Sequence, residues 1–260
     1  MPVPQLATAS ITDRIQRLGE KELFTRFDVK AIENDIDKLQ KVSAVEAFML
    51  SGMLYAAIGN YEESKAKHEK SLLLPHDFVQ LVNYGISMRR LSRLNEAKDL
   101  FRRALDKNPG SVALLQKYIQ SSTFLLDYSG LDEVLARFAK ANPNIDLDKF
   151  EWMETTSSIL MHLEAVSIEM DAYSLFGQHV QQVLQEYSVR NNNLHERMGK
   201  FEGTEYVYVE FLVKVSASSV LTSMNERLAE LVLSDDRIEC WDKVVINFTS
   251  FNKDTDSEAA

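Results

Sequence analysis

Apolar residues follow a helical spacing over most of this 260-residue chain and a strand spacing near its carboxy-terminal end. Tyr173, Phe176, Val180 and Val183 recur at intervals of three and four residues, which is the period of an amphipathic helix. Between residues 206 and 215 the period is two, as expected for a strand. The sequence therefore predicts a mainly α protein, α+β overall, in which a series of helices precedes a small carboxy-terminal β-α-β unit.

Three prolines, Pro75, Pro109 and Pro143, follow one another at intervals of 34 residues. A fixed period of this length indicates a repeat array, because a single helical hairpin must bury its apolar side against its neighbours. Glycine and proline are otherwise sparse, 9 and 5 in the whole chain, which favours long helices. The alternative is an ordinary helix bundle in which this period arises by chance.

The residues between these prolines resemble the tetratricopeptide repeat. In the second unit, the positions that define the family are occupied by Gly85, Ala97, Phe101, Ala104 and Pro109. The resemblance covers residues 44–143 and implies a solenoid of stacked helical hairpins. The third unit is expected to have a turn about three residues longer, and a shorter second helix.

Two glycines have a physical role in this interpretation. Gly52 and Gly85 lack a Cβ atom, so the first helix of each hairpin can approach the second closely at these points. Phe101 then fills the space between the helices of the second unit. In the first unit His68 takes the usually aromatic position, and we expect it to pack rather than to bind a metal.

The amino-terminal part is predicted to be helical, and the chain as a whole to divide into four segments. Two short helices, over 11–18 and 29–39, form a cap or a degenerate earlier hairpin. The segments are an amino-terminal part over 1–43, the array with a fourth, capping hairpin over 44–193, a small α/β unit over 204–251, and a disordered acidic tail over 252–260.

The α/β unit is expected to begin after a linker, because Arg190–Asn193 and the stretch 199–203 indicate a boundary. Its strands are predicted over 206–215 and 244–248, with a third, very short strand over 237–241. So small a sheet has open edges and needs a cover. We therefore expect a homodimer through residues 204–251, with docking onto the helical array as the alternative.

Composition excludes several classes of function. The net charge of −10 argues against general binding of nucleic acids or anionic membranes. No apolar run is long enough for a membrane-spanning helix and no secretory signal is visible, so we expect a cytoplasmic protein. The single cysteine, Cys240, excludes an intramolecular disulfide framework and a cysteine-rich zinc site.

Motifs that carry catalysis are absent from the sequence. The five histidines lack metal-ligand spacing, and no nucleophile elbow or phosphate-binding glycine loop is present. Glu239 and Asp242 lie next to Cys240 and disfavour a reactive thiolate. We expect no metal, no cofactor and no enzyme; an enzyme in the carboxy-terminal unit remains a third hypothesis.

The resemblance implies that the first helices of the hairpins line a concave groove. Met49 and Met53 stand where a chaperone-clamping relative would have a lysine and an asparagine, so a chaperone clamp is not expected. Methionine and aliphatic residues instead suit an amphipathic helix or an apolar peptide. The groove residues are predicted to be Met49, Met53, Val82, Asn83, Ile86, Arg89, Gln116, Lys117 and Gln120.

A basic stretch over residues 89–107 carries seven lysines and arginines against three acidic residues. One interpretation is a solvated helix face with i,i+3 and i,i+4 ion pairs. The other is a contact surface for an acidic partner segment, formed by Arg90, Arg93, Arg102 and Arg103.

Two functions follow from these patterns. The first is a protein–protein interaction scaffold that binds a partner peptide or helix in the concave groove. The alternative is an acidic regulator, such as an antitoxin or immunity protein, that neutralises a basic partner; it rests on size, charge and the small α/β unit.

Overall fold

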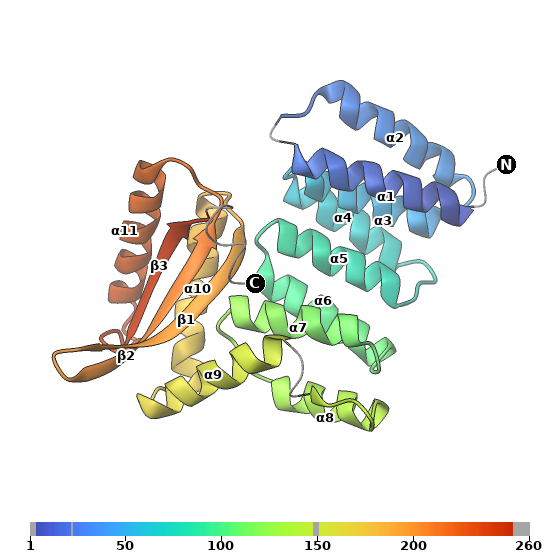
Figure 1. Ribbon diagram of the computed structural model, residues 1–260. Helices are drawn as coiled ribbons and strands as arrows, with labels where there is room; N and C mark the ends of the chain where they lie inside the picture. The colour runs from blue at the N-terminus through green and yellow to red at the C-terminus, as the bar shows by residue number, and fades with distance from the viewer. Residues whose placement is uncertain (1–3, 22, 148–150, 252–260) are drawn as a thin grey trace. The chain divides into compact units, whose positions relative to one another are not determined.

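The computed structural model describes residues 4–21, 23–147 and 151–251 of the chain. The predicted fold class is confirmed for these residues, since helices make up most of them and one small sheet lies near the carboxy-terminal end (Figure 1). The predicted tail, residues 252–260, lies outside the described part. The chain divides into two compact units, residues 1–114 and 115–260.

The first unit contains three helical hairpins. Helices α1, α3 and α5 are the first helices of these hairpins, and α1 packs on α3 as α3 packs on α5. The second helices, α2 and α4, pack on the first helix of the next hairpin. The bounds are α1 Pro4–Glu20, α2 Arg26–Gln40, α3 Ala44–Ala57, α4 Tyr61–Leu72, α5 Phe78–Arg90 and α6 Leu94–Lys107.

The amino-terminal pair α1 and α2 is a full hairpin whose helices are longer than predicted. Ile15 on α1 and Ile32 and Ile36 on α2 are buried in one apolar cluster with α3. Thr25 caps α2 through a reciprocal pair of hydrogen bonds with Asp28, which fixes the start of the helix. The hairpin therefore continues the stack and contributes to its core.

Two glycines set the spacing within the second and third hairpins. A Cβ atom on Gly52 would overlap the ring of His68, and one on Gly85 would overlap the ring of Phe101. Both glycines thus permit a close approach of the two helices, as the sequence analysis predicts. His68 and Phe101 occupy equivalent places in successive hairpins.

One turn conformation recurs at the end of each first helix from α3 onward. Gly59, Ser92, Leu126 and Ser167 have positive φ angles of 81, 56, 51 and 55°. In each case the next amide donates to the carbonyl five residues earlier in the chain, as from Asn60 to Tyr55 at 2.9 Å and from Arg93 to Met88 at 2.9 Å. The same local geometry therefore closes four successive hairpins.

The third of these turns is longer, as predicted. α8 begins at Leu131, five residues after Leu126, whereas α4 begins two residues after Gly59. α8 has 11 residues, against 12 in α4 and 14 in α6. Both expectations for the third repeat are confirmed.

The second unit contains most of α7 and all later elements. A Cβ atom on Gly177 of α10 would overlap the backbone carbonyl of Leu125, so α10 passes very close to the end of α7. The bounds are α7 Val112–Phe124, α8 Leu131–Ala141, α9 Glu151–Ala165, α10 Met170–Glu186, β1 Asn191–Phe201, β2 Thr204–Val213, α11 Ser218–Ser234 and β3 Val244–Ser250.

The sheet has the order β1-β2-β3, with β1 antiparallel and β3 parallel to β2. Glu202 and Gly203 form the two-residue turn between β1 and β2, and both have positive φ angles, 49 and 88°. The predicted linker over 190–203 is therefore wrong, because it is the first strand. The expected short strand over 237–241 is also wrong, since these residues form turns.

One face of the sheet is largely buried. Val207, Val209 and Phe211 of β2 are 0% exposed, and Phe248 of β3 lies beside Phe211 with ring centroids 6.0 Å apart. α11 packs on β3 and on α10, and α9 contacts β1. The opposite face carries the half-buried Tyr206 and Tyr208 and the 43% exposed Val245.

The outer edge of β3 is closed by a side chain. The backbone N–H of Phe248 donates to Oδ1 of Asn225 at 2.7 Å, and its carbonyl accepts from Nδ2 of Asn225 at 3.0 Å. Asn225 on α11 thus pairs with both backbone groups that a neighbouring strand would use. The expected open edge, which motivated a homodimer, is blocked at this point of β3.

Asn225→Ala should lower the free energy of unfolding by about 1–3 kcal/mol, because two backbone groups at the β3 edge lose their partners. It should also promote self-association, since the edge becomes available for strand pairing. Urea denaturation and sedimentation velocity measure the two effects, with the exposed Ser223→Ala on the same helix as the control. Equal stability and mass in the two variants would contradict this role of Asn225.

Candidate functional site

The candidate site in the first unit depends on how α4 is held. The buried residues of α4 are Ser64, His68 and Ser71, and none of them is aliphatic. Ser64 Oγ donates to the carbonyl of Gly52 at 2.9 Å, and Ser71 Oγ donates to the carbonyl of Val45 at 2.8 Å. Hydrogen bonds to the backbone of α3 therefore replace the usual apolar stripe of a packed helix.

His68 is the central contact of α4. It is 1% exposed, its Nε2 lies 2.9 Å from Ser87 Oγ, and its ring stacks on Tyr84 with centroids 4.6 Å apart. Burial lowers the pKa of His68 from 6.5 to about 3, because an imidazolium would lose its hydration there. The residue therefore packs as a neutral ring between α4 and α5.

A groove of about 730 Å³ lies between α4 and α6, and α5 contributes Tyr84 to its lining. Its apolar surface comes from Leu72, Leu73, Tyr84 and Leu100, and Leu73 is 85% exposed. Leu73 therefore forms an exposed apolar rim of the groove, beside the half-buried Leu72. The polar lining residues are Lys65, Glu69, Asn95, Glu96, Asp99 and Arg103.

The charges of the groove are mostly paired. Lys65 Nζ lies 3.3 Å from Glu96 Oε2, and Tyr61 donates a hydrogen bond to Glu96 Oε1 at 2.8 Å. Hydrogen bonding to Tyr61 and the charge of Glu96 raise the pKa of Lys65, so it stays protonated. Asp99 interacts with Arg102 and Arg103 at 2.8 and 3.9 Å.

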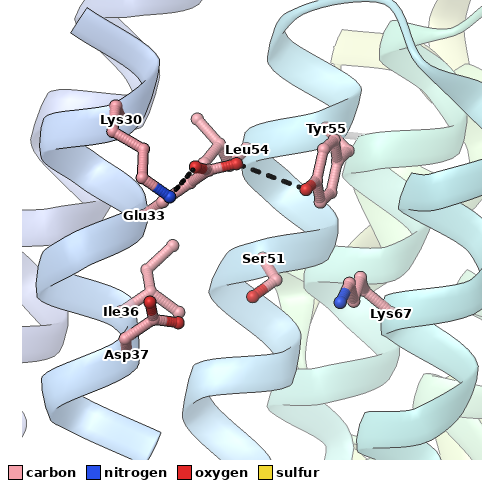
Figure 2. Close-up of a pocket in the computed structure, with 8 residues that line it drawn as sticks. All are labelled: Lys30, Glu33, Ile36, Asp37, Ser51, Leu54, Tyr55 and Lys67. Atoms are coloured by element: carbon pink, nitrogen blue, oxygen red, sulfur yellow. Dashed lines mark hydrogen bonds and ion pairs between the residues drawn. The ribbon is translucent and has the colours of Figure 1, made fainter. Parts of the chain in front are cut away.

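A second pocket, of about 230 Å³, lies at the equivalent place between α2 and α4 (Figure 2). Its rim is polar: Glu33 pairs with Lys30 at 3.1 Å and accepts a hydrogen bond from Tyr55 at 3.3 Å. Ile36 and Leu54 supply its apolar part. The pocket is smaller than the α4–α6 groove and carries no leucine exposed at its rim.

The structure brings together only some of the predicted groove residues. Met49 is 4% exposed, and its sulfur accepts a hydrogen bond from Asn83 Nδ2 at 3.2 Å. Met53 packs against the core of the first unit. Met49 is therefore part of the interior and is wrong as a groove residue.

The remaining predicted groove residues divide between the two units. Val82, Ile86 and Arg89 are half-buried on α5. Gln116, Lys117 and Gln120 lie on α7 in the second unit. The resemblance to the repeat family predicts all of these residues from the first helices, and it does not address the spaces between the second helices.

The predicted basic patch does not form one surface. Arg90 packs against Gly19 of α1, and Arg93 lies over the ring of Tyr61 at 4.2 Å. Arg102 and Arg103 instead pair with Asp99, three and four residues away along α6. The interpretation as a helix face with i,i+3 and i,i+4 ion pairs is confirmed for these two arginines.

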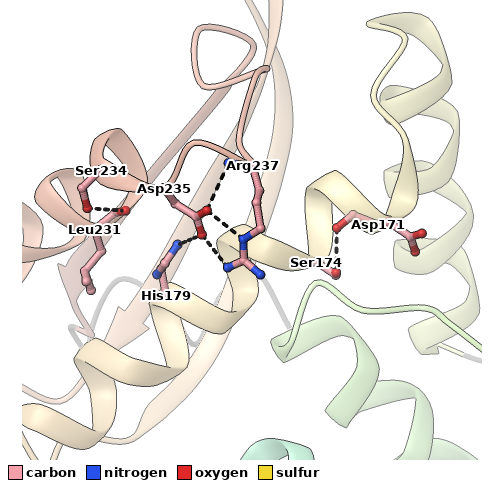
Figure 3. A network of polar contacts seen from close by, with 7 residues as sticks. All are labelled: Asp171, Ser174, His179, Leu231, Ser234, Asp235 and Arg237. Atoms are coloured by element: carbon pink, nitrogen blue, oxygen red, sulfur yellow. Dashed lines mark hydrogen bonds and ion pairs between the residues drawn. The ribbon is translucent and has the colours of Figure 1, made fainter.

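In the second unit a polar network links α10 to the loop after α11 (Figure 3). Asp235 Oδ2 lies 2.9 Å from His179 Nε2 and 2.7 Å from Arg237 Nη2. Hydrogen bonds from Arg237 hold the pKa of Asp235 well below its usual range. No sequence motif predicts this contact, because His179 and Asp235 are 56 residues apart.

A second histidine–carboxylate pair lies on the buried face of the sheet. The side chain of Glu196 on β1 is 2% exposed, and its Oε1 lies 2.7 Å from Nδ1 of His162 on α9. Burial raises the pKa of Glu196, while His162 opposes that change. Within the described residues, no group of three or more His, Cys, Asp or Glu side chains is arranged to hold a metal ion.

Comparisons with protein-family models, with curated proteins and with solved structures returned no match for this chain. No helix in the described part of the chain combines the length and the apolar character needed to cross a membrane.

Acidification should destabilise the protein through His68. The unfolded state binds a proton near pH 6.5 and the folded state only near pH 3, so stability is lost as the pH falls between these values. The His68 contribution lost between pH 7 and pH 4.5 is about 2–3 kcal/mol. Thermal melts followed by far-UV circular dichroism measure the loss.

The double variant His68→Phe with Ser87→Ala removes the titrating ring and the hydroxyl that it contacts. We expect this variant to lose less stability than the unsubstituted chain over the same pH interval, because a phenyl ring binds no proton. An equal acid sensitivity of the two proteins would show that His68 does not control it.

Proposed function

We propose that residues 1–114 form a protein-interaction module whose binding surface is the groove between α4 and α6. The observation that carries this proposal is the apolar lining of the groove, where Leu73 is 85% exposed next to Leu72, Leu100 and Tyr84. Because polar contacts hold α4 to α3, the leucines at the end of α4 are left for another partner. This proposal keeps the scaffold function inferred from the sequence, but it places the binding surface between α4 and α6 and not on the first helices.

We also infer that the three hairpins are tetratricopeptide-like repeats. The equivalent contacts of Gly52 with His68 and of Gly85 with Phe101 support this inference. So does the recurring turn with a positive φ angle at Gly59 and Ser92. Arrays of this type bind protein segments on surfaces shared by adjacent repeats.

A protein segment fits the groove better than a small molecule does. Small-molecule sites enclose their ligand and present a few unpaired polar groups that converge on it. Here Lys65, Glu96 and Asp99 are engaged with one another or with neighbouring arginines. The two walls are helices, which suits a segment that lies along them.

Leu73→Glu should abolish partner binding, because it places a carboxylate on the apolar surface of the groove. Leu73 is largely solvent-exposed, so the change should leave the helical content unaltered. Leu23→Glu is a matched control, since Leu23 is 89% exposed elsewhere in the same unit. Quantitative mass spectrometry of proteins retained from host extract by each variant measures the effect.

The experiment also tests the concave surface that the sequence predicts. Met53→Glu together with Ile86→Glu alters that surface and leaves the groove intact. Partners lost with this pair but kept with Leu73→Glu would transfer the binding site to the first helices. Partners kept by every variant would exclude both surfaces.

Charge is the one observation that favours the alternative function. Residues 1–114 contain 17 lysines and arginines against 15 acidic residues, whereas residues 115–260 contain 12 against 24. An acidic surface that neutralises a basic partner therefore belongs to the second unit. Binding that disappears at high salt and is insensitive to Leu73→Glu would support this function.

Self-association through the sheet is a separate proposal, for which the structure leaves fewer surfaces than the sequence suggests. Asn225 closes the β3 edge at Phe248, so a second copy has to use the edge of β1 or the face with Tyr208 and Val245. Sedimentation at tens of micromolar distinguishes a dimer from a monomer.

A further inference from the structure

We propose that the occupant of the α4–α6 groove is a basic amphipathic helix, with a leucine-sized side chain one turn away from a lysine or arginine. This inference rests on the proposed function, because it assigns a partner chemistry to the same groove. It follows from the one groove charge that is left unpaired and from the spacing of the lining residues.

Glu69 carries that charge. It lines the groove from α4, is exposed, and makes no ion pair with any residue of the described chain. The two cations that line the groove are already compensated, Lys65 by Glu96 at 3.3 Å and Arg103 by Asp99 at 3.9 Å. A partner therefore meets an unpaired negative charge on an otherwise balanced surface, which favours a cationic group at that point.

The spacing on α4 places this charge beside the apolar surface. Glu69 precedes Leu72 and Leu73 by three and four residues, so the carboxylate lies one helical turn from both leucines. On α6, Glu96, Leu100 and Arg103 line the groove at intervals of four and three residues. Both walls thus present side chains at the period of a helix.

These walls favour a helix over an extended peptide. The backbone groups of α4 and α6 are bonded within their helices, so the groove offers no strand edge to which an extended segment could add. Recognition has to use side chains alone. A helix whose side-chain ridges fit between α4 and α6 presents apolar and basic residues at intervals of three and four.

The test uses two fluorescein-labelled 18-residue peptides designed as amphipathic helices. Both carry leucine on the apolar face; one carries lysine, and the other glutamate, a turn away from each leucine. Fluorescence anisotropy gives the affinity of the full-length protein for each. We expect the lysine peptide to bind more tightly, and Glu69→Lys to weaken it about threefold while strengthening the glutamate peptide, as for an exposed ion pair.

Glu63→Lys is the matched control, because Glu63 is exposed on α4 and does not line the groove. It makes the same change of net charge and should leave the preference between the peptides unaltered. An equal effect of the two substitutions would overturn the inference, since it would report net charge alone. Absence of binding by both peptides up to millimolar concentration would also overturn it.

The outcomes separate this inference from the function on which it rests. Binding that is lost in Leu73→Glu but keeps the same peptide preference in Glu69→Lys leaves the groove as the site and rejects the basic helix. Binding of the lysine peptide that survives Leu73→Glu places the contact elsewhere and rejects the groove itself.

Discussion

The architecture of the first unit depends on the attachment of one nearly polar helix. α4 has little apolar surface to bury, and Ser64, His68 and Ser71 hold it to its neighbours. Each buried hydroxyl bond contributes about 1 kcal/mol, and a buried serine hydroxyl without its carbonyl acceptor would cost more than that. These polar contacts therefore fix the position of α4 more than they stabilise the folded unit. Stability comes instead from buried apolar side chains on the neighbouring helices. These are the cluster that α1 and α2 form with α3, and Phe101 on α6.

The same attachment determines what the surface offers. α4 packs through Ser64, His68 and Ser71 and presents Leu72 and, just after its end, Leu73 to the groove. The neutral ring of His68 fits this arrangement, because it fills the place of Phe101 and also bonds to Ser87. A charged imidazole there would need water that the packing excludes. The polar anchors and the apolar groove are thus two sides of one helix.

Local signals predicted the helices, whereas contacts between distant residues were missed. The close approach at Gly85 and the long third turn could be predicted because both are encoded within a single hairpin. The sequence predicts a linker in place of β1 because of Arg190–Asn193 and the stretch 199–203. The strand itself shows no clean alternation, because Glu196 interrupts the apolar positions of its buried face, and His162, which pairs with it, lies 34 residues away. The groove is not predicted because the resemblance places the binding surface on the first helices, whereas most of the groove lining lies on the second helices α4 and α6.

Net charge is a poor guide to the groove because it is an average over two unlike units. The acidic excess lies entirely in residues 115–260, and the first unit is nearly neutral. Screening at physiological ionic strength limits the reach of exposed charges to about 8 Å, so distant carboxylates contribute little to a contact on α4. A segment bound there would meet the charge of Glu69, because the neighbouring charged residues of the groove are paired with one another. In the proposed interaction, a few side chains of the first unit therefore govern recognition, and the acidity of the whole chain does not.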